Sequence, residues 1–220
     1  MQSNLPPSSA PQTSRRPGRK LITWGVVILV LLVIIVPGCS SYNSLNVMSK
    51  DVDAAWSQVQ VQYQRRADLI PNLVNSVKGY TAHESGTLEA VTNARAGLLS
   101  AENAANESAS TSAPKSEEEL QNYLSAQERL KGALSIYVNA VREAYPDLKA
   151  DRMFQDLNAQ LEGTENRIAT ERGRYTQIVR DYNVKVSRFP TVIYARIFGF
   201  DERPQFQATA EAQAAPVVQF

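Results

Sequence analysis

The chain holds one cysteine, Cys39, and one histidine, His83, among its 220 residues. A single cysteine excludes a disulfide within the chain, and one cysteine with one histidine cannot supply the usual ligands of a zinc site. The sequence also lacks a glycine-rich phosphate loop and a nucleophile motif of the GxSxG kind. These absences argue against the common catalytic classes, so we predict a protein that is not an enzyme and binds no cofactor or metal.

Acidic residues are missing from the first twenty positions, which carry four basic side chains, Arg15, Arg16, Arg19 and Lys20. Subtracting these four from the 23 basic residues leaves 19 against 22 acidic ones, so the rest of the chain is mildly acidic. Nucleic-acid binding requires Lys and Arg clustered against the phosphate backbone. We therefore expect no nucleic-acid partner, and we assign residues 1–20 to a basic cytoplasmic segment.

Charge is also absent from residues 21–36, LITWGVVILVLLVIIV, and the uncharged stretch continues through residue 39. Its sixteen strongly apolar residues lie between a signal-peptide core of about 7 to 15 and a membrane span of about 20. Basic residues precede the stretch, and the next one after it is Lys50. This asymmetry predicts a single pass through the inner cell membrane, with a cytoplasmic N-terminus and an extracytoplasmic body.

Two kinds of anchor are compatible with residues 21–39. Val36-Pro37-Gly38-Cys39 is similar to a bacterial lipoprotein signal, in which the cysteine becomes the lipid-bearing N-terminus. Pro37 is an unusual occupant of its place in such a signal, and twenty residues before the apolar run are many for a signal peptide. The sequence favours an uncleaved transmembrane helix and leaves lipid attachment at Cys39 as the alternative.

Beyond the anchor, apolar residues recur at spacings of three and four, which is typical of amphipathic helices. Four such apolar seams cover residues 45–63, 70–98, 120–148 and 154–186. Segments of comparable length can close on one another, whereas a continuous helix through the first two seams would extend roughly 90 Å and lack a partner over half its length. We predict an all-α fold, an antiparallel four-helix bundle of long helices over residues 40–200, followed by a tail at 201–220.

Pro71 stands between the first two seams. Proline lacks the amide that bonds back one helical turn, and it is well tolerated in the first turn of a helix. We therefore expect the chain to reverse near residues 67–70, with Pro71 opening the second helix. A polar loop over residues 100–116 then precedes the third helix, where Ser116 and Glu119 have the spacing of a capping box.

Three polar residues, Glu84, Gln127 and Glu165, fall on the seams where apolar residues would be expected. An interior carboxylate must be paired or hydrogen-bonded to avoid a large desolvation cost. Three arginines could supply the partner: Arg65, Arg66 and Arg95. We interpret the polar residues as a layer that fixes the register of the helices, in preference to a carboxylate pair for acid and base catalysis.

The segment His83-Glu84-Ser85-Gly86-Thr87-Leu88 is superficially similar to the phosphoacceptor box of sensor histidine kinases, which a helical bundle also carries. Against this similarity, the chain has no ATP-binding domain, and we expect the bundle outside the cytoplasm. A helix histidine beside an acidic residue is the simpler interpretation. A signalling or regulatory role that uses His83 remains the alternative function.

The longest motif of the chain is RRADLIPNLVNSVKGY at residues 65–80, followed by His83-Glu84. Its distinctive residues, which we interpret as structural, are Arg65, Arg66, Asp68, Pro71, Asn72, Tyr80, His83 and Glu84. Together with Asp53-Ala54-Ala55-Trp56 and Asp181-Tyr182-Asn183, this motif resembles the LemA family, and the resemblance extends from residue 42 to residue 200. It implies a helical bundle on a membrane anchor and brings no established enzymatic activity.

These observations predict a membrane-anchored, non-enzymatic bundle that binds or organises other cell-envelope proteins. Its expected partners are the membrane and envelope proteins, and a homo-oligomer is compatible with the sequence. No motif specifies which proteins it binds.

Overall fold

The computed structural model of the chain describes residues 19–81, 89–109 and 112–207. Its elements, in chain order, are α1 (Arg19–Thr81), α2 (Glu89–Glu107), α3 (Glu117–Ala144), the short 3-10 helix η1 (Leu148–Ala150), α4 (Arg152–Ser187) and α5 (Thr191–Phe198). The described part of the chain contains no strand, which confirms the all-α prediction.

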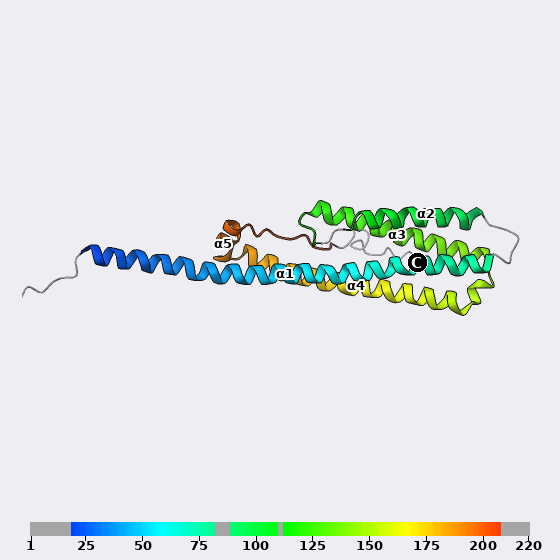
Figure 1. The fold of residues 1–220 in the computed structure, drawn as a ribbon, viewed down its shortest axis with the longest axis horizontal. Coiled ribbons are helices and arrows are strands. Elements are labelled where there is room, and N and C mark those ends of the chain that lie inside the picture. Colours follow the sequence, from blue (N-terminus) through cyan, green and yellow to red (C-terminus); the bar gives the residue numbers. More distant parts are fainter. Residues whose placement is uncertain (1–18, 82–88, 110–111, 208–220) are drawn as a thin grey trace, which may run out of the picture.

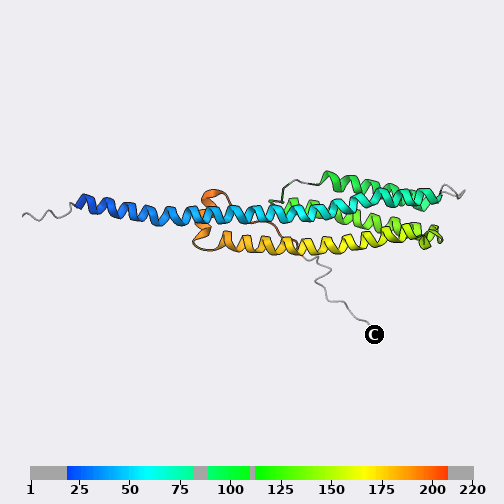
Figure 2. The ribbon, with the colours of Figure 1, turned by 60° about the horizontal axis from the view of Figure 1, so that its bottom comes forward.

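The helices form two pairs that lie side by side. α1 packs along α4 and α2 packs along α3, and the two pairs together make a four-helix bundle at one end of the molecule (Figure 1). The N-terminal part of α1 projects well beyond the other helices at the opposite end (Figure 2). The predicted bundle is therefore present, but it occupies only part of an elongated molecule.

The predicted reversal at residues 67–70 is wrong, because α1 continues through Pro71 to Thr81. At 63 residues α1 is about 95 Å long. Pro71 costs a helix interior about 3 kcal/mol. The Pro71 ring is exposed, whereas Ile70 and Leu73 on either side of it are buried in the core. Each buried aliphatic side chain contributes about 1.5 to 3 kcal/mol of stability. The apolar contacts on both sides of the proline therefore offset the missing hydrogen bond.

The other boundaries follow local capping. The hydroxyl of Ser116 accepts a hydrogen bond from the Glu119 amide at 3.2 Å, which confirms half of the expected capping box. The Glu119 carboxylate reaches the amide of Lys115, one residue before the cap, at 2.9 Å. The predicted loop at 100–116 begins later than expected, since α2 continues to Glu107 through alanine-rich sequence that favours helix.

Two apolar clusters make up the core. The distal cluster joins all four bundle helices around residues such as Ile70, Leu98 and Tyr137. The membrane-proximal cluster lies mainly between α1 and α4 and centres on Trp56, which is fully buried. The Trp56 ring lies 5.1 Å from Tyr123 and 5.4 Å from Tyr175, between ring centroids. Trp56 is thus a core residue.

The N-terminal part of α1 exposes a continuous apolar surface. Trp24 and the large aliphatic side chains from Val26 to Val36 that the structure describes are between 42% and 66% exposed. This stretch is long and apolar enough to cross a membrane, and only 6% of it is buried. The described residues contain one helix with these properties, in the place that the sequence predicts.

A short helix and an extended segment follow α4. α4 ends at Ser187, just before Phe189-Pro190, and α5 packs against both α1 and α4. Gly199 adopts a left-handed conformation with a φ of 73°, which lets the chain leave α5 and turn back along the bundle. Residues 200–207 then run beside α4 towards Trp56, and the ring of Phe206 stacks on it at 6.2 Å.

Candidate functional site

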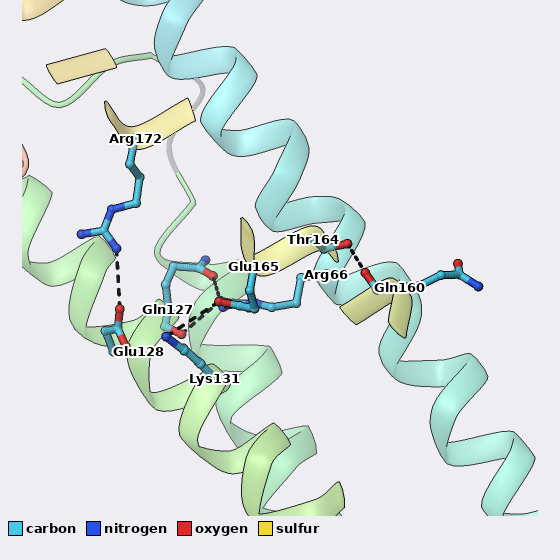
Figure 3. A network of polar contacts seen from close by, with 8 residues as sticks. All are labelled: Arg66, Gln127, Glu128, Lys131, Gln160, Thr164, Glu165 and Arg172. Atoms are coloured by element: carbon cyan, nitrogen blue, oxygen red, sulfur yellow. Dashed lines mark hydrogen bonds and ion pairs between the residues drawn. The ribbon is translucent and has the colours of Figure 1, made fainter. Parts of the chain in front are cut away.

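A buried polar layer separates the two apolar clusters. Its centre is Arg66 on α1, which is only 1% exposed although it carries a positive charge. Gln127 on α3 and Glu165 on α4 face it, so the layer joins three helices (Figure 3). The structure thus confirms that Gln127 and Glu165 belong to one polar layer and identifies Arg66 as their partner.

Arg66 is held by three hydrogen bonds. One guanidinium nitrogen donates to Glu165 Oε1 at 2.9 Å, and the other donates to the Gln127 side-chain oxygen at 2.6 Å and to its backbone oxygen at 3.0 Å. The same guanidinium lies 5.2 Å from the ring centroid of Tyr63. The planar fork of arginine suits this arrangement, which a lysine could not reproduce.

Weaker ion pairs surround the layer. Lys131 Nζ lies 3.9 Å from Glu165, and Arg172 lies 3.7 Å from Glu128. Lys131 and Glu128 are more than half exposed, so solvent weakens these pairs. Arg66 differs because its charge is removed from water and depends on the protein for compensation. The layer therefore penalises any sliding of α1 against α3 and α4.

The other described motif residues lie on the surface of α1. Arg65 is exposed and faces a shallow depression on α4 near Gly163. Asp68 accepts a hydrogen bond from Gln64 at 2.8 Å, and its backbone oxygen accepts one from Asn72 at 3.4 Å. Both contacts are local to the helix. The motif thus combines the buried Arg66 and buried apolar residues on one side of α1 with exposed polar residues on the other.

Tyr80 lies near the end of α1, but its side chain is outside the described part of the structure. His83 and Glu84 fall in the segment 82–88, which is also outside the described residues. The predicted place of Glu84 in the polar layer and the phosphoacceptor hypothesis for His83 therefore stay predictions.

The Asp181-Tyr182-Asn183 motif holds the C-terminal segment. The Asn183 side-chain amide donates to the Arg203 backbone oxygen and accepts from the Arg203 amide, each at 2.8 Å. The Tyr182 hydroxyl donates to the Asp201 backbone oxygen at 3.0 Å. Sequence reasoning missed this clamp, because its partners are backbone atoms of a segment without periodic pattern.

A groove runs along α1 and α4 in the membrane-proximal half of the bundle. Its volume is about 650 Å³, and its lining belongs to these two helices. We call it the α1–α4 groove, and its lining includes Met48, Asp51, Ala54, Gln58, Arg174, Ile178 and Asp181. The lining combines the small Ala54 and the apolar Met48 and Ile178 with exposed charged side chains.

Several buried tyrosines also lie in the core. Burial removes the phenols from water and raises the pKa of Tyr137 to about 12, and it raises the pKa of Tyr63, Tyr123 and Tyr175 in the same direction. These phenols stay neutral at physiological pH and serve packing. The described residues also contain no group of three or more His, Cys, Asp or Glu side chains that could hold a metal ion.

The chain matches the LemA family over residues 55–220. It is 29% identical over 207 residues to magnetosome protein MamQ 2 of Paramagnetospirillum magneticum, an alignment that covers 89% of this chain and 76% of that protein. It is 25% identical over 167 residues to Protein LemA of Metamycoplasma hominis, covering 76% and 69% of the two chains.

The exposed apolar helix and the attached bundle define a membrane-associated helical protein. The match over residues 55–220 also places the chain within a family. The protein belongs to the LemA family, as the motif at residues 65–80 indicates. Its similarity to the magnetosome proteins covers most of both chains.

Proposed function

We propose that the protein is a non-enzymatic, membrane-held bundle that binds another cell-envelope protein in the α1–α4 groove. The observation that carries this proposal is the groove itself, a recess of about 650 Å³ between two long, rigid helices. In the distal half of the molecule the α2–α3 pair covers α1 and α4 (Figure 1). In the membrane-proximal half the groove is lined by α1 and α4 alone.

The lining of the groove favours an amphipathic helix as the occupant. Ala54 is small and would let a helix backbone approach α1 closely, while Met48 and Ile178 offer apolar contact. Asp51 and Asp181 stand exposed at the rims. A partner helix with a narrow apolar stripe and flanking Lys or Arg residues fits this surface.

We infer the orientation from the charges that precede the membrane helix. Four basic residues within positions 15–20 and none between residues 21 and 49 favour a cytoplasmic N-terminus, with the bundle on the extracytoplasmic side of the inner membrane. The groove, which begins near Met48, then lies close to the membrane surface and within reach of other membrane-attached proteins.

A retained helix is the anchor that the contacts favour. Gly38 precedes Cys39 and is buried against the ring of Tyr194, a contact that cleavage before Cys39 would remove. Lipid attachment at the exposed Cys39 remains the alternative. Replacing Cys39 by Ser separates the two, because a retained helix keeps the protein in the membrane without any loss of lipid mass.

The groove is tested by photocrosslinking in native membranes. A photoreactive amino acid at Gln58 places the probe in the groove, and the same probe at Arg180, exposed on α4 outside the lining, is the control. We expect a discrete adduct at position 58 with an envelope protein other than this chain. Asp51→Lys with Asp181→Lys should abolish it, whereas Glu118→Lys with Glu143→Lys, an equal charge change on the exposed surface of α3, should not.

The adduct supports the proposed function only if the crosslinked partner also binds the protein directly. The protein identified by mass spectrometry should bind the purified full-length chain, and the double reversal at Asp51 and Asp181 should weaken that binding at least about tenfold, or roughly 1.4 kcal/mol. The same set of adducts at positions 58 and 180 would contradict the proposal. An adduct with a second copy of the chain would replace it with self-association.

A further inference from the structure

The outward side of α5 is apolar. Ile193 and Ile197, one helical turn apart, are 49% and 69% exposed, and Phe189 just before the helix is 77% exposed. On the opposite side Thr191 and Ala195 are buried against the bundle. A helix on a water-facing surface usually directs polar residues outward. We call Phe189, Ile193 and Ile197 the α5 stripe.

α5 is fixed to α1 immediately after the exposed apolar stretch. A Cβ atom at Gly38 would stand 3.1 Å from Tyr194 Cε1, so glycine is what allows the Tyr194 ring to lie against α1. The rings of Tyr42 and Phe198 meet edge to face at 5.1 Å between centroids. Figure 2 shows α5 at the end of the bundle from which α1 projects.

The length of the apolar stretch places α5 relative to a bilayer. A hydrocarbon core about 30 Å thick takes about 20 helical residues. Counted from Leu21, directly after Lys20, such a span ends near Ser40. The contacts of α5 with Gly38 and Tyr42 lie on either side of that residue. α5 is therefore held at the level where acyl chains give way to headgroups.

We propose that α5 and Phe189 lie in the interface of the same bilayer that α1 crosses, with the α5 stripe in contact with lipid. Interfacial helices bury their apolar faces about 5 to 10 Å into this boundary. Arg196 lies next to Ile197 and is exposed, so its stem can follow the apolar surface while its charge reaches the headgroups. This inference rests on the membrane span in the proposed function.

Lipid fits the α5 stripe better than a second copy of the chain does. The stripe lies beside the exposed apolar surface of α1, where Val33 and Val36 are 65% and 61% exposed. Three side chains are also far fewer than the roughly 20 to 30 residues that each partner contributes to a stable protein interface. A second membrane contact at α5 would fix the tilt of the bundle and hold the α1–α4 groove at a set height.

Collision accessibility of spin labels tests the proposal in full-length protein reconstituted into lipid nanodiscs. In a Cys39→Ser background, single cysteines replace Ile197, Phe189, Val33 and Arg180, and each carries a nitroxide. Oxygen concentrates in the acyl region and a nickel chelate stays in water. We expect the ratio of oxygen to nickel accessibility at 197 and 189 to exceed the ratio at 180 severalfold and to approach the ratio at 33.

Each alternative outcome has a distinct meaning. A lipid-like ratio at 33 with water-like ratios at both 197 and 189 would overturn the α5 proposal and leave the anchor intact. A water-like ratio at 33 would overturn the anchor and the inference with it. Protection of 197 and 189 from both reagents would show that protein covers the stripe and would also overturn lipid contact. Two independent positions guard against a local effect of one label.

Discussion

Replacing Arg66 by Met should destabilise the bundle by about 2 to 4 kcal/mol. Methionine keeps much of the buried volume but cannot donate hydrogen bonds, so the Gln127 side-chain oxygen loses its 2.6 Å donor. A buried acceptor without a partner costs about 1 to 3 kcal/mol, and loss of the pair with Glu165 adds to this. Glu165 is 29% exposed and can return partly to water, which keeps the total below that of a fully buried pair.

Two further variants identify the cause of the Arg66 effect. Arg66→Met with Gln127→Leu removes the stranded side-chain oxygen, so this double variant should recover at least about 1 kcal/mol relative to the single one. Lys131 lies 3.9 Å from Glu165, and its side chain is 54% exposed. Lys131→Met should therefore cost less than about 1 kcal/mol of stability.

Urea unfolding of the full-length chain in nonionic detergent measures these differences. Trp56 lies in the core near the layer, so its fluorescence reports bundle unfolding once Trp24 has been replaced by Phe. Free energies of unfolding for Arg66→Met and Lys131→Met that agree within about 0.5 kcal/mol, the scale of surface substitutions, would refute the role of the buried Arg66. A double variant that is no more stable than Arg66→Met would also refute the role assigned to Gln127.

Three other predictions follow from single positions. Pro71→Ala should raise the urea midpoint by an amount equivalent to about 1 to 3 kcal/mol, since the exposed proline denies α1 a hydrogen bond; an unchanged or lower midpoint would contradict this. Burial disfavours the phenolate and raises the pKa of Tyr137 to about 12 in the folded protein, whereas its pKa in the unfolded chain is about 10. Its contribution to stability is therefore present below pH 10 and is lost between pH 10 and 12. Over this range the free energy of unfolding should fall less steeply with pH in Tyr137→Phe than in the unmodified protein, by up to about 1.4 kcal/mol per pH unit. An identical slope in the two proteins would argue against this role of Tyr137. Asn183→Ala should speed cleavage after Glu202 by a glutamate-specific protease severalfold, because it releases the clamp on the Arg203 backbone, while Gln177→Ala, which removes an exposed contact with Asp181, should leave the rate unchanged.

The course of α1 shows where sequence reasoning succeeded and where it failed. The apolar spacing correctly predicts helices on both sides of Pro71. The predicted reversal at residues 67–70 is wrong because it follows from the helix-breaking tendency of proline alone. The buried positions Tyr63, Arg66, Ile70, Leu73 and Val77 keep spacings of three and four across Pro71. That unbroken phase was the signal for a continuous helix. A proline on the exposed side of a helix can be compensated by packing on the other side, and packing is not visible in local propensity.

The polar layer was predictable in part. Gln127 and Glu165 interrupt apolar seams, and such residues in a bundle require a partner, so a layer could be expected from the sequence. The choice of Arg66 over its neighbour Arg65 depends on which side of α1 faces α3 and α4. The helical phase set by Tyr63 and Ile70 favours Arg66, because that position lies on their buried side.

The groove and the C-terminal clamp could not be predicted in the same way. The groove exists because α2 and α3 are shorter than α1 and α4, so it depends on helix lengths and on their alignment. The clamp depends on backbone atoms of Asp201 and Arg203, which any residues at those positions would provide. Asp181-Tyr182-Asn183 marks the place of the clamp without revealing its partner.

The most direct test of a membrane-held bundle with a partner groove is the yield of photocrosslinked adduct at Gln58 relative to Arg180 in native membranes. The account predicts a discrete envelope-protein adduct at position 58 that is absent at position 180 and that disappears when Asp51 and Asp181 are both changed to Lys. Equal adducts at the two positions, or an adduct that survives both charge reversals, would contradict it.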